Sequence, residues 1–586
     1  MWDCRQETYC KGDERGIAKC HREKVARPPG LFVMIADGRV RKMSLDRRLL
    51  RWNGWGLVDA PDLLGEKAET FWAWAGRAFG MDPLPHTPAK DLSAIELPAC
   101  RLAPGLLAEL ESLCGRGNVK TDHYERVWHA RGRSYHDLLY LRAGHIGAAP
   151  DVVVYPETGE QVLELIRFAV RENTALVPFG GGSSVVGGVN ASVPGGWAGV
   201  ITVDMTHMDQ LIEIDAESMR ARIQAGMYGP ALEAALQARG FTLGHYPQSF
   251  EYSTLGGWIA ARSAGHQSNK YGKAEEWFVS ARLATPWGFW ETEHFPGSAA
   301  GPQMKNLVPG SEGTLGIITE AVVHIHRVPE TKDYRGYLFP GFEAGIAAAR
   351  DMMQNEIPTA MIRLSDLTET FFYNALDTGG AGADAPAVFC VMLVGLEGET
   401  ARIESAREQC KAIVAKHGGF HIGETPGKTW YTGRFLTPYL RDPLLDRGLG
   451  VDTLETATRW TNLLPLYQAT VAAMEKALEE NAPRPGLRNV VMAHVSHSYR
   501  DGASLYFTFV FPRSLDREVG QWLAVKRAAS EAIVANGGTI SHHHGIGTDH
   551  TPWLGREKGP IAMELLRAIK RTADPKGVLN PGKLFE

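Results

Sequence analysis

The chain has 586 residues, more than one hydrophobic core can hold, so several domains are expected. Its 62 Lys and Arg residues and 67 Asp and Glu residues give a net charge of −5 without a basic stripe, which excludes a nucleic-acid-binding protein. The seven cysteines form no Cys-x-x-Cys pair, so neither a disulfide framework nor a zinc site is indicated.

The sequence shows no targeting signal. No apolar run approaches the roughly 18 residues needed to span a bilayer, and no secretory signal opens the chain. The ending Lys583-Leu584-Phe585-Glu586 differs from the Ser-Lys-Leu peroxisomal signal, so we expect a cytoplasmic protein. Residues 1–42 are basic, contain three cysteines and lack apolar periodicity, and we interpret them as a disordered extension or a misassigned start.

Four further regions follow in chain order. Residues 43–145 mix Trp-rich stretches with short helical patterns and are predicted to form an N-terminal helical region. Residues 146–328 alternate strands with helices, starting with a β-α-β unit made of strand 152–154, helix 159–171 and strand 175–178. Residues 329–540 are predicted to form an α/β substrate or cap domain, with a helix at 342–354, a strand at 387–394 and mostly helix at 452–480. Residues 541–586 are predicted to be a C-terminal helical segment that packs back on the cofactor site.

A glycine loop at 178–188, Pro-Phe-Gly-Gly-Gly-Ser-Ser-Val-Val-Gly-Gly, follows the apolar run 175–177. Glycines allow backbone N–H groups to converge on an anion, so the loop predicts a phosphate or pyrophosphate site, with an ordinary glycine-rich turn as the alternative. The glycines and proline within 185–197 cannot sustain a helix, and this excludes a Rossmann-type fold or a Walker loop.

Three later segments strengthen this hypothesis: 247–257, 263–272 and 310–319 are rich in small and hydroxyl-bearing residues. In order, the four segments resemble the FAD-binding domain of the vanillyl-alcohol oxidase and para-cresol methylhydroxylase (PCMH) superfamily. The resemblance implies an α/β (α+β) fold, with FAD between two subdomains of a PCMH-type domain. Because Ser183-Ser184 stands where many members carry a flavin-linking His, we expect non-covalent FAD. The implied FAD-binding residues are Pro178, Phe179, Gly180, Gly181, Gly182, Ser183, Ser184, Gln248, Ser249, Phe250, Glu251, Tyr252, Ser253, Thr254, Gly257, Ala261, Arg262, Ser263, Ala264, Glu312, Gly313, Thr314, Leu315, Gly316, Ile317 and Ile318.

A strand at 504–511 places Tyr506 opposite an apolar face. Period-two alternation puts Phe507, Phe509 and Phe511 on one face, which is predicted to be core, and Tyr506 on the other, facing either solvent or a site. The Asp501-Gly502 turn predicts a hairpin with the preceding strand, 489–498. A two-residue loop there would pair His497 with Tyr506, whereas a register slip would bring His494 to the Tyr506 face.

Three adjacent histidines, His542, His543 and His544, lie between glycine pairs. Neighbouring residues on a strand point to opposite faces, so a strand could not aim all three at one ion, although His542 and His544 could pair. No carboxylate cluster is evident nearby in the sequence. We therefore predict a polar wall of an active site and no metal.

The chain resembles the alkylglycerone-phosphate synthase family, also called alkyl-dihydroxyacetonephosphate synthase, from about residue 50 to near the end. Its marks include Trp52-Asn53-Gly54-Trp55-Gly56, Leu440-Arg441-Asp442 and Ser541-His542-His543-His544-Gly545. That family exchanges the acyl chain of acyl-dihydroxyacetone phosphate for a long-chain alcohol in ether lipid synthesis, without net redox change. The resemblance therefore implies a lipid substrate, with peripheral membrane contact and a homodimer as further implications.

The resemblance also assigns roles to residues. Tyr506 matches the proposed acid/base and His542, His543 and His544 match the essential histidine cluster. Arg441 matches the substrate-phosphate arginine, and its guanidinium suits phosphate, although an arginine beside an aspartate is also typical of a surface ion pair. Arg363 and His245 match further substrate-site positions.

Two departures keep a second function open. His494 stands where relatives can carry arginine, so the charge at that position is in question. The ending 574–584 resembles those of glycolate oxidase and D-lactate dehydrogenase flavoproteins. The alternatives are therefore an FAD-linked oxidase or dehydrogenase of a 2-hydroxy acid or alcohol, or a non-enzymatic flavoprotein scaffold.

Overall fold

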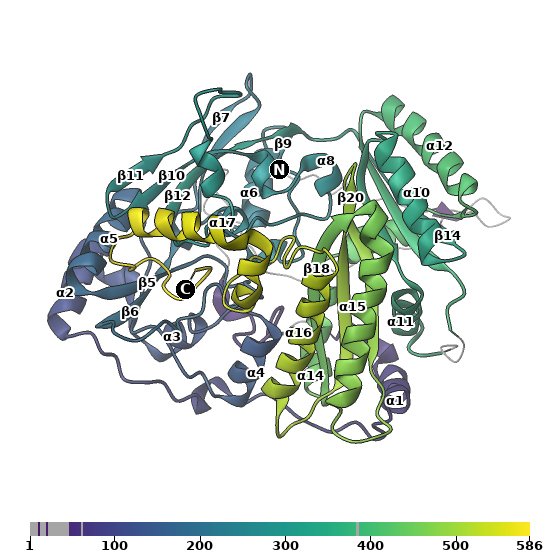
Figure 1. Cartoon of the computed structure of the whole chain (residues 1–586), viewed down its shortest axis with the longest axis horizontal. Helices are drawn as coiled ribbons and strands as arrows, with labels where there is room; N and C mark the ends of the chain where they lie inside the picture. The colour runs from purple at the N-terminus through teal and green to yellow at the C-terminus, as the bar shows by residue number, and fades with distance from the viewer. Residues whose placement is uncertain (1–9, 12–18, 21–45, 60–61, 382–385, 586) are drawn as a thin grey trace.

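The computed structural model describes residues 10–11, 19–20, 46–59, 62–381 and 386–585 (Figure 1). Most of the predicted extension, 1–42, lies outside these residues. Within it the structure describes only the antiparallel pair β1 (Cys10–Lys11) and β2 (Lys19–Cys20).

The predicted β-α-β unit is confirmed in a four-stranded sheet. Strands β4 (Val152–Val154) and β5 (Thr174–Phe179) flank β6 (Gly199–Asp204) in parallel, and β3 (Val119–Lys120) is the antiparallel edge. Helix α5 (Gly159–Glu172) connects β4 to β5, and its apolar stripe packs on the sheet because Val162, Ile166 and Ala169 are buried at helical spacing. The glycine loop follows β5 directly, and no helix is present between residues 180 and 198, as predicted.

A second, five-stranded sheet follows, with all its neighbouring strands antiparallel. Its order is β11 (Gly288–Glu291), β10 (Phe278–Thr285), β12 (Ile317–His324), β8 (Arg220–Gln224) and β7 (Leu211–Asp215). Around it lie the short pair β9 (Phe241–Thr242) and β13 (His326–Arg327), and helices α6 (Gly229–Gln237), α7 (Leu255–Ala260), α8 (Ser268–Tyr271) and α9 (Ala274–Trp277).

The third sheet has seven antiparallel strands and carries much of the site. Its order is β17 (Phe420–Gly423), β14 (Thr331–Phe339), β16 (Cys390–Gly398), β15 (Thr359–Ser365), β19 (Val490–Ser498), β20 (Gly502–Pro512) and β18 (Leu449–Arg459). One face is covered by α10 (Phe342–Gln354), α12 (Thr400–Lys416), α15 (Trp460–Glu480) and α16 (Glu518–Ala535) (Figure 1). The predicted core role of Phe507, Phe509 and Phe511 is confirmed there, since all three are at most 1 % exposed.

Two element predictions in this region need correction. Residues 452–459 belong to strand β18, and the helix begins only at Trp460, because four β-branched residues from Val451 to Thr458 favour the pleated sheet over a helix. The strand predicted at 387–394 runs later, from Cys390 to Gly398. The helix predicted at 342–354 is confirmed.

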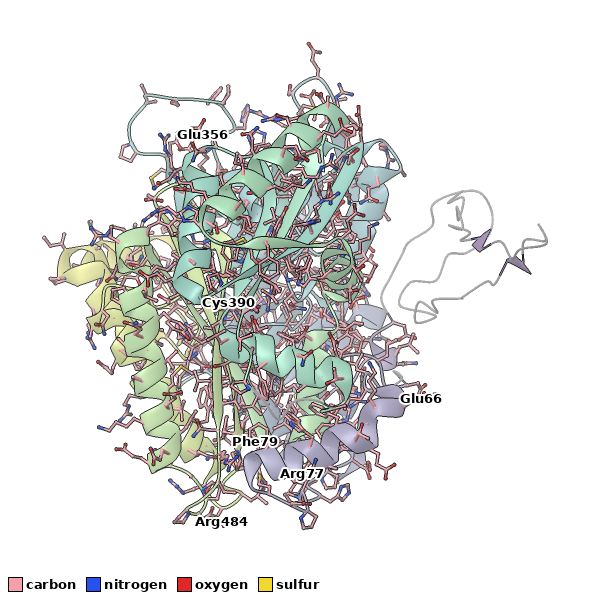
Figure 2. The ribbon with its side chains drawn as sticks, turned by 90° about the vertical axis from the view of Figure 1, so that its right-hand side faces the viewer. Glu66, Arg77, Phe79, Glu356, Cys390 and Arg484 are labelled. Carbon is pink, nitrogen blue, oxygen red and sulfur yellow. The ribbon has the colours of Figure 1, made fainter. Side chains whose placement is uncertain are left out.

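The other face of the seven-stranded sheet packs on α1 (Ala68–Phe79), α11 (Leu367–Thr378) and α14 (Arg441–Leu445). Figure 2 labels Arg77 and Phe79 at the end of α1, and the Arg484 guanidinium donates to the carbonyl of Gly80, directly after this helix, at 2.9 Å. The N-terminal region also contains α2 (Pro104–Cys114), α3 (His123–Trp128) and α4 (Tyr135–Ala143), and α13 (Thr425–Gly433) lies beside β14.

The C-terminal helix α17 (Thr551–Ala573) returns across the cofactor-binding half (Figure 1). After it, Leu579 forms a parallel bridge with Leu176 of β5: Leu176 N–H donates to Val578 and Asn580 N–H donates to Leu176, each at 2.8 Å. Among the described residues, no helix is long and apolar enough to cross a membrane.

Candidate active site

A cavity of about 1160 Å³ lies between the glycine loop and the face of the seven-stranded sheet that carries Tyr506. Its size exceeds the usual range for a single small ligand, about 300–1000 Å³, and suits a cofactor together with a substrate. Most of the predicted FAD residues line it, namely Pro178, Phe179, Gly180, Gly181, Gly182, Ser183, Ser184, Gln248, Ser249, Ser253, Thr254, Gly257, Ala261, Ser263, Ala264, Glu312, Gly313, Gly316, Ile317 and Ile318.

The glycine loop needs its glycines because the second segment packs against it. A Cβ on Gly181 would lie 1.5 Å from the Tyr252 carbonyl oxygen, and one on Gly180 would lie 2.3 Å from Thr254 Oγ1. The loop thus presents backbone with few side chains to the cavity, the kind of cradle that a pyrophosphate requires. The residues present fit FAD.

Arg47 holds the glycine loop by a hydrogen bond to its backbone. It lies in the short helix η1 (Arg47–Leu49), and its guanidinium donates to the Gly180 carbonyl at 2.9 Å. The same guanidinium pairs with Asp204 at the end of β6 at 2.5 Å, and Asp204 also contacts His129 Nε2 at 2.8 Å. Burial alone would raise the pKa of the Asp204 carboxyl, but Arg47 and His129 hold it well below its usual value. A buried ion pair therefore ties the loop to the carboxyl ends of two parallel strands.

Tyr506 lies in a row of three side chains across neighbouring strands. In the β19–β20–β18 register it pairs with His494 on one side and Glu455 on the other, so all three point to the same face. The His494 and Tyr506 rings are 5.1 Å apart between centroids. The two-residue loop that would pair His497 with Tyr506 is not formed. The turn extends from Tyr499 to Gly502 and a bulge follows Val495, so His494 lies opposite Tyr506.

The Tyr506 hydroxyl donates to Thr453 Oγ1 at 3.0 Å. Burial raises the pKa of Tyr506, while the Thr453 contact and the Arg441 charge act in the opposite direction. Its ring also lies against His543 and His544, with centroid distances of 6.1 and 5.7 Å. Tyr506 is therefore a neutral phenol beside two imidazoles that line the same cavity.

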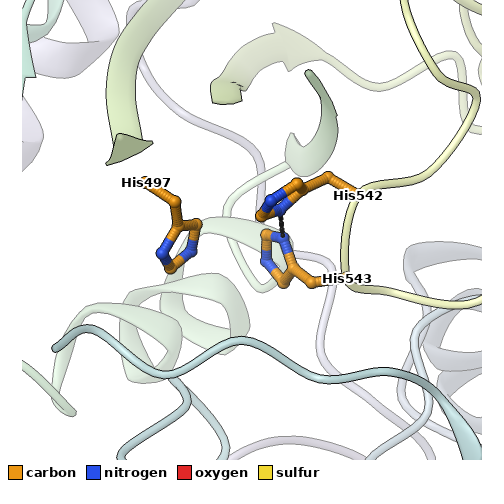
Figure 3. A group of neighbouring side chains, drawn as sticks. All are labelled: His497, His542 and His543. Carbon is orange, nitrogen blue, oxygen red and sulfur yellow. Dashed lines mark hydrogen bonds between the residues drawn. The ribbon is translucent and has the colours of Figure 1, made fainter. Parts of the chain in front are cut away.

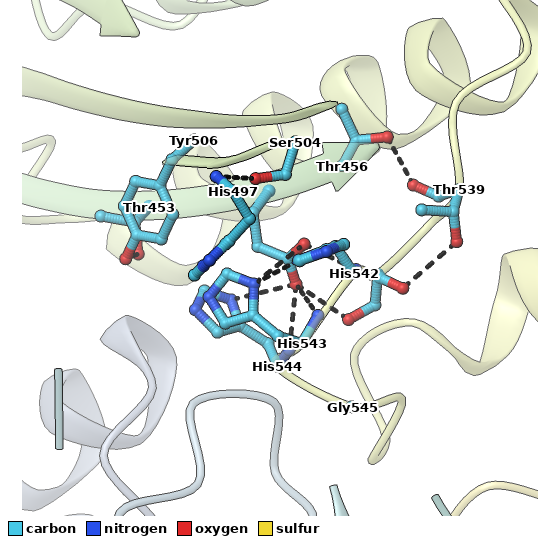
Figure 4. Close-up of polar contacts among 12 residues, drawn as sticks. Thr453, Thr456, His497, Ser504, Tyr506, Thr539, His542, His543, His544 and Gly545 are labelled. Carbon is cyan, nitrogen blue, oxygen red and sulfur yellow. Dashed lines mark hydrogen bonds and ion pairs between the residues drawn. The ribbon is translucent and has the colours of Figure 1, made fainter. Parts of the chain in front are cut away.

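The three adjacent histidines lie in a loop before α17, not on a strand, so the argument from strand faces does not apply to them. Glu455 organises this loop by accepting the backbone N–H groups of His542, His543 and His544 at 2.6, 3.1 and 3.0 Å. Figure 4 shows these three histidines beside Tyr506, with the contacts drawn as dashed lines. Burial alone would raise the pKa of Glu455, but His544 and the three N–H donors hold it below its usual value. Burial lowers the pKa of His543 and His544, so both imidazoles are neutral near pH 7.

Arg363 supplies a positive charge beside His494. Its guanidinium lies 2.8 Å from His494 Nε2 and 3.0 Å from Glu369 Oε1. His494 Nδ1 also contacts Glu369 Oε1, at 2.8 Å. Burial and the Arg363 charge lower the pKa of His494, so the histidine is neutral and Arg363 carries the charge.

Arg441 is not in a surface ion pair with its neighbour Asp442. It is only 9 % exposed, lines the cavity, and its guanidinium lies 3.5 Å from Asp452. Asp442 instead accepts the Trp55 backbone N–H at 2.9 Å, and a Cβ on Gly54 would lie 2.0 Å from its carboxylate. The Trp-Asn-Gly-Trp-Gly motif thus packs on the short helix that carries Arg441.

Several predicted site residues do not line the cavity. His245 is buried between Trp258 and Trp277, and its Nε2 contacts Ser263 Oγ at 3.2 Å, so it can only support a lining residue. Arg262 pairs with Glu275 at 3.0 Å. Phe250, Glu251, Tyr252, Thr314 and Leu315 lie behind the lining, in core contacts or in hydrogen bonds to other segments, and His542 stands behind His543.

Other residues at the cavity were not among the predicted site residues: His266, Arg434 and His497 line it, and Glu455 and Lys273 stand behind it, although the sequence had offered His497 as a partner of Tyr506. The Lys273 ammonium donates to the His542 carbonyl at 2.6 Å. His266 lies within the predicted cofactor segment 263–272 and Lys273 follows it directly, whereas His497, Arg434 and Glu455 each come from a separate part of the chain. Alternation along a strand could have indicated Glu455, but the prediction of a helix at 452–480 concealed it.

One end of the cavity is apolar, and we call this the apolar arm. It is formed by α11, α14 and the adjoining strands, and its lining residues are Phe371, Phe372, Leu376, Leu440, Leu444, Val451, Met492 and Val510. These eight side chains are apolar, although Asn374 and Asp377 of α11 also line the cavity, whereas the Tyr506 end carries Arg363, Arg441 and several histidines. A ligand with a charged head and a long hydrocarbon chain matches this division.

The fold and the site define a PCMH-type, FAD-binding enzyme. Two family models match, "FAD binding domain" at residues 150–292 and "FAD linked oxidases, C-terminal domain" at 328–584. A solved p-cresol methylhydroxylase, 15 % identical, shares the fold with a TM-score of 0.61 over 83 % of this chain and 98 % of that one.

More similar proteins define the family. The chain is 34 % identical over 578 residues to the alkyldihydroxyacetonephosphate synthase of Dictyostelium discoideum, covering 92 % of this chain and 93 % of that one. A solved alkyldihydroxyacetonephosphate synthase, 31 % identical, superimposes with a TM-score of 0.76 over 92 % of this chain and 98 % of the other. The chain belongs to the alkyldihydroxyacetonephosphate synthase family.

Proposed function

We propose that this chain uses bound FAD to exchange the acyl group of acyl-dihydroxyacetone phosphate for a long-chain alcohol, forming the ether bond of ether lipids. The observation that carries the proposal is that one cavity joins the FAD-binding loops, the Tyr506 row and the apolar arm. Family membership supports the same reaction.

The arginines of the cavity suit the phosphate head. Arg441 and Arg363 both line the polar end, and a guanidinium is a planar, permanently charged donor for phosphate oxygens. Arg441 has a single carboxylate contact, at 3.5 Å, whereas Arg363 is held by Glu369 and His494 at 3.0 and 2.8 Å. We assign the phosphate to Arg441 and assign to Arg363 the polarisation of the substrate's keto end.

The Tyr506 row suits proton transfer beside the ketone. Oxidised FAD, when bound, supplies an electron sink. Burial raises the pKa of Tyr506 and lowers that of His544, so the phenol is protonated and the imidazole is neutral. The Tyr506 hydroxyl, which donates to Thr453 Oγ1, can therefore give a proton to the substrate, and the His544 imidazole beside its ring can accept one.

Anaerobic spectroscopy of the yellow protein tests the reaction. Acyl-dihydroxyacetone phosphate should bleach the flavin and release fatty acid, and adding fatty alcohol should restore the colour and give the ether product. If fatty acid is not released, or no ether forms, the proposal fails.

One observation favours a second function, an FAD-linked oxidase or dehydrogenase. The match to the "FAD linked oxidases, C-terminal domain" runs through the ending 574–584, which bridges to β5. Full reduction by a 2-hydroxy acid, reversed by an electron acceptor, would establish this function instead. If the flavin responds to neither compound, the third alternative, a non-enzymatic flavoprotein scaffold, is favoured.

The remaining parts of the proposal rest on sequence. We assign non-covalent FAD because the glycine loop offers serines where a tether would need a histidine, and denaturation should then release all of the flavin. A cytoplasmic location, peripheral membrane contact and a homodimer complete the proposal.

A further inference from the structure

Three imidazoles, two of them buried and one half-buried, converge at one point next to the cavity. His497 comes from the end of β19, and His542 and His543 come from the loop before α17. Their ring centroids form a nearly equilateral triangle with sides of 5.1, 5.2 and 5.1 Å, and one ring nitrogen of each lies within 4.8 Å of the others (Figure 3). The triangle joins segments more than 40 residues apart, so it is produced by the fold and not by the triple-His motif alone.

The triangle has the dimensions of a tetrahedral metal site. Zinc binds imidazole nitrogen at about 2.0–2.1 Å, which places the centroids of three tetrahedrally arranged rings roughly 5 Å apart. The two Nδ1 atoms of His542 and His543 are already 2.9 Å from each other. Small rotations of the rings would bring all three nitrogens to coordination distance.

The outer nitrogens of two of these rings are held by hydrogen bonds. His497 Nδ1 contacts Ser268 Oγ at 2.7 Å, which leaves Nε2 to face the centre, and His542 Nε2 contacts the Tyr499 hydroxyl at 2.5 Å, which leaves Nδ1. Such partners select the tautomer and orient metal-binding histidines. Glu455 Oε2 lies 3.6 Å from His543 Nδ1 and contributes a negative charge near the centre.

We propose that His497, His542 and His543 form a three-histidine site for a divalent transition metal of the Zn²⁺ class. Because His497 and His543 line the cavity, the fourth coordination position opens toward it, as in zinc sites that keep a position for water or a ligand. This inference concerns a second ligand of the chain and does not depend on the proposed function.

A neighbouring set, Glu455 with His543 and His544, is a weaker candidate for the same ion. The Glu455 oxygens already accept three backbone N–H groups and the Ser541 hydroxyl, at 2.6–3.1 Å. A metal there would have to displace these donors, whereas the three-histidine set only exchanges one imidazole–imidazole hydrogen bond for coordination. His543 is common to both sets, so at most one ion is expected.

Cobalt titration of the FAD-loaded, full-length protein tests the site, because Co²⁺ in a tetrahedral nitrogen environment gives visible d–d bands. We expect these bands to saturate at one Co²⁺ per chain and to be removed by added Zn²⁺. His497→Asn and His543→Asn should each abolish them, and Ser268→Ala should weaken Co²⁺ binding about 10-fold by releasing His497.

Two control variants separate the alternatives. His145→Ala, which changes an exposed histidine, should bind Co²⁺ like the wild type, and so should His544→Ala if the three-histidine set is the site. The flavin spectrum and melting temperature of each variant show whether it is folded. The inference is overturned if one equivalent of Co²⁺ gives no tetrahedral bands, or if folded His497→Asn retains them. Loss of the bands in folded His544→Ala with retention in His497→Asn would assign the ion to the Glu455 set instead.

Discussion

Glu455 lies directly opposite Tyr506 in the pairing of β18 and β20, and the same carboxylate accepts the backbone N–H groups of His542, His543 and His544. One buried residue thus links the tyrosine strand to the histidine loop. The relative position of Tyr506 and the imidazoles depends on it.

Glu455→Gln should therefore lower kcat while the chain still folds. Glutamine can accept through only one oxygen, so at least one buried N–H loses its partner at a cost of about 1–3 kcal/mol. If the lost hydrogen bond raises the activation free energy by this amount, kcat decreases roughly 10- to 100-fold. Glu557→Gln is the matched control, because Glu557 is exposed and accepts the Ile540 N–H at the start of the same loop. Equal kcat values for the two variants would contradict the role of Glu455.

Tyr506→Phe should abolish turnover while FAD stays bound. The substitution removes only the hydroxyl, so the ring still packs against His494, and a lost acid/base group typically costs about 10²–10⁴-fold in rate. Steady-state kinetics and the flavin spectrum measure the two effects separately. Thr453→Val should have a smaller effect, since it removes only the group that orients the hydroxyl. Substantial turnover by Tyr506→Phe would remove Tyr506 from the acid/base role.

Glu369 should contribute stability that is lost in acid. Burial alone would raise its pKa, but Arg363 and His494 lower it from 4.5 to about 2. A lowered carboxyl pKa stabilises the fold above the unfolded pKa, and this stability disappears as the pH falls from about 4.5 to 2. The shift corresponds to a few kcal/mol, on the order of 3.

Glu369→Gln should accordingly be less stable than wild type at pH 7, and the gap between their melting temperatures should narrow below pH 4.5. Thermal unfolding at a series of pH values measures it. Glu343→Gln, which changes an exposed glutamate on α10, should show no such convergence. A gap that stays constant with pH would show that Glu369 does not act through its charge.

Arg47→Ala should destabilise the cofactor half by leaving Asp204 buried without its cation. Breaking a buried ion pair in this way typically costs about 3–5 kcal/mol, and FAD should dissociate more readily because Gly180 loses a donor. Adding Asp204→Asn should restore part of the stability. Arg48→Ala is the control, since Arg48 is the exposed neighbour in the same short helix. Melting temperature and FAD retention on a desalting column report the outcome.

Val451→Trp should shorten the chain that the apolar arm accepts. Val451 lines the arm on β18, and an indole there would fill space that a long alkyl chain needs. We expect kcat/KM to fall for long-chain alcohols and to change little for short ones. Val451→Ala should preserve activity toward long chains. A uniform decrease over all chain lengths would indicate damage to the site instead of a shortened arm.

Much of the cofactor half could be predicted from local signals. The glycine loop, the absence of a following helix and the β-α-β unit are each properties of a short segment, and the structure confirms them. The Phe face of β20 was equally predictable from alternation, because only one face of that strand is apolar.

The polar end of the site depends on distant pairings, which local patterns do not encode. The longer hairpin turn and the bulge after Val495 decide that His494 pairs with Tyr506. The backbone of the triple-His loop is held by Glu455, 87 residues away from His542. Both relationships require the register of three strands, and a one-residue error in register reverses the face of every side chain.

The bridge between residues 578–580 and Leu176 has a consequence for biosynthesis. Asn580 also donates to the Gly188 and Glu312 carbonyls, at 3.1 and 2.7 Å, so this last stretch joins the glycine loop to a later FAD-binding segment. Residues 578–580 are synthesised some 400 residues after Leu176, so the cofactor half cannot complete its folding until they have been made. Capture of flavin is therefore expected to follow synthesis of residues 578–580, and yellow colour would report that this stretch has joined the cofactor half.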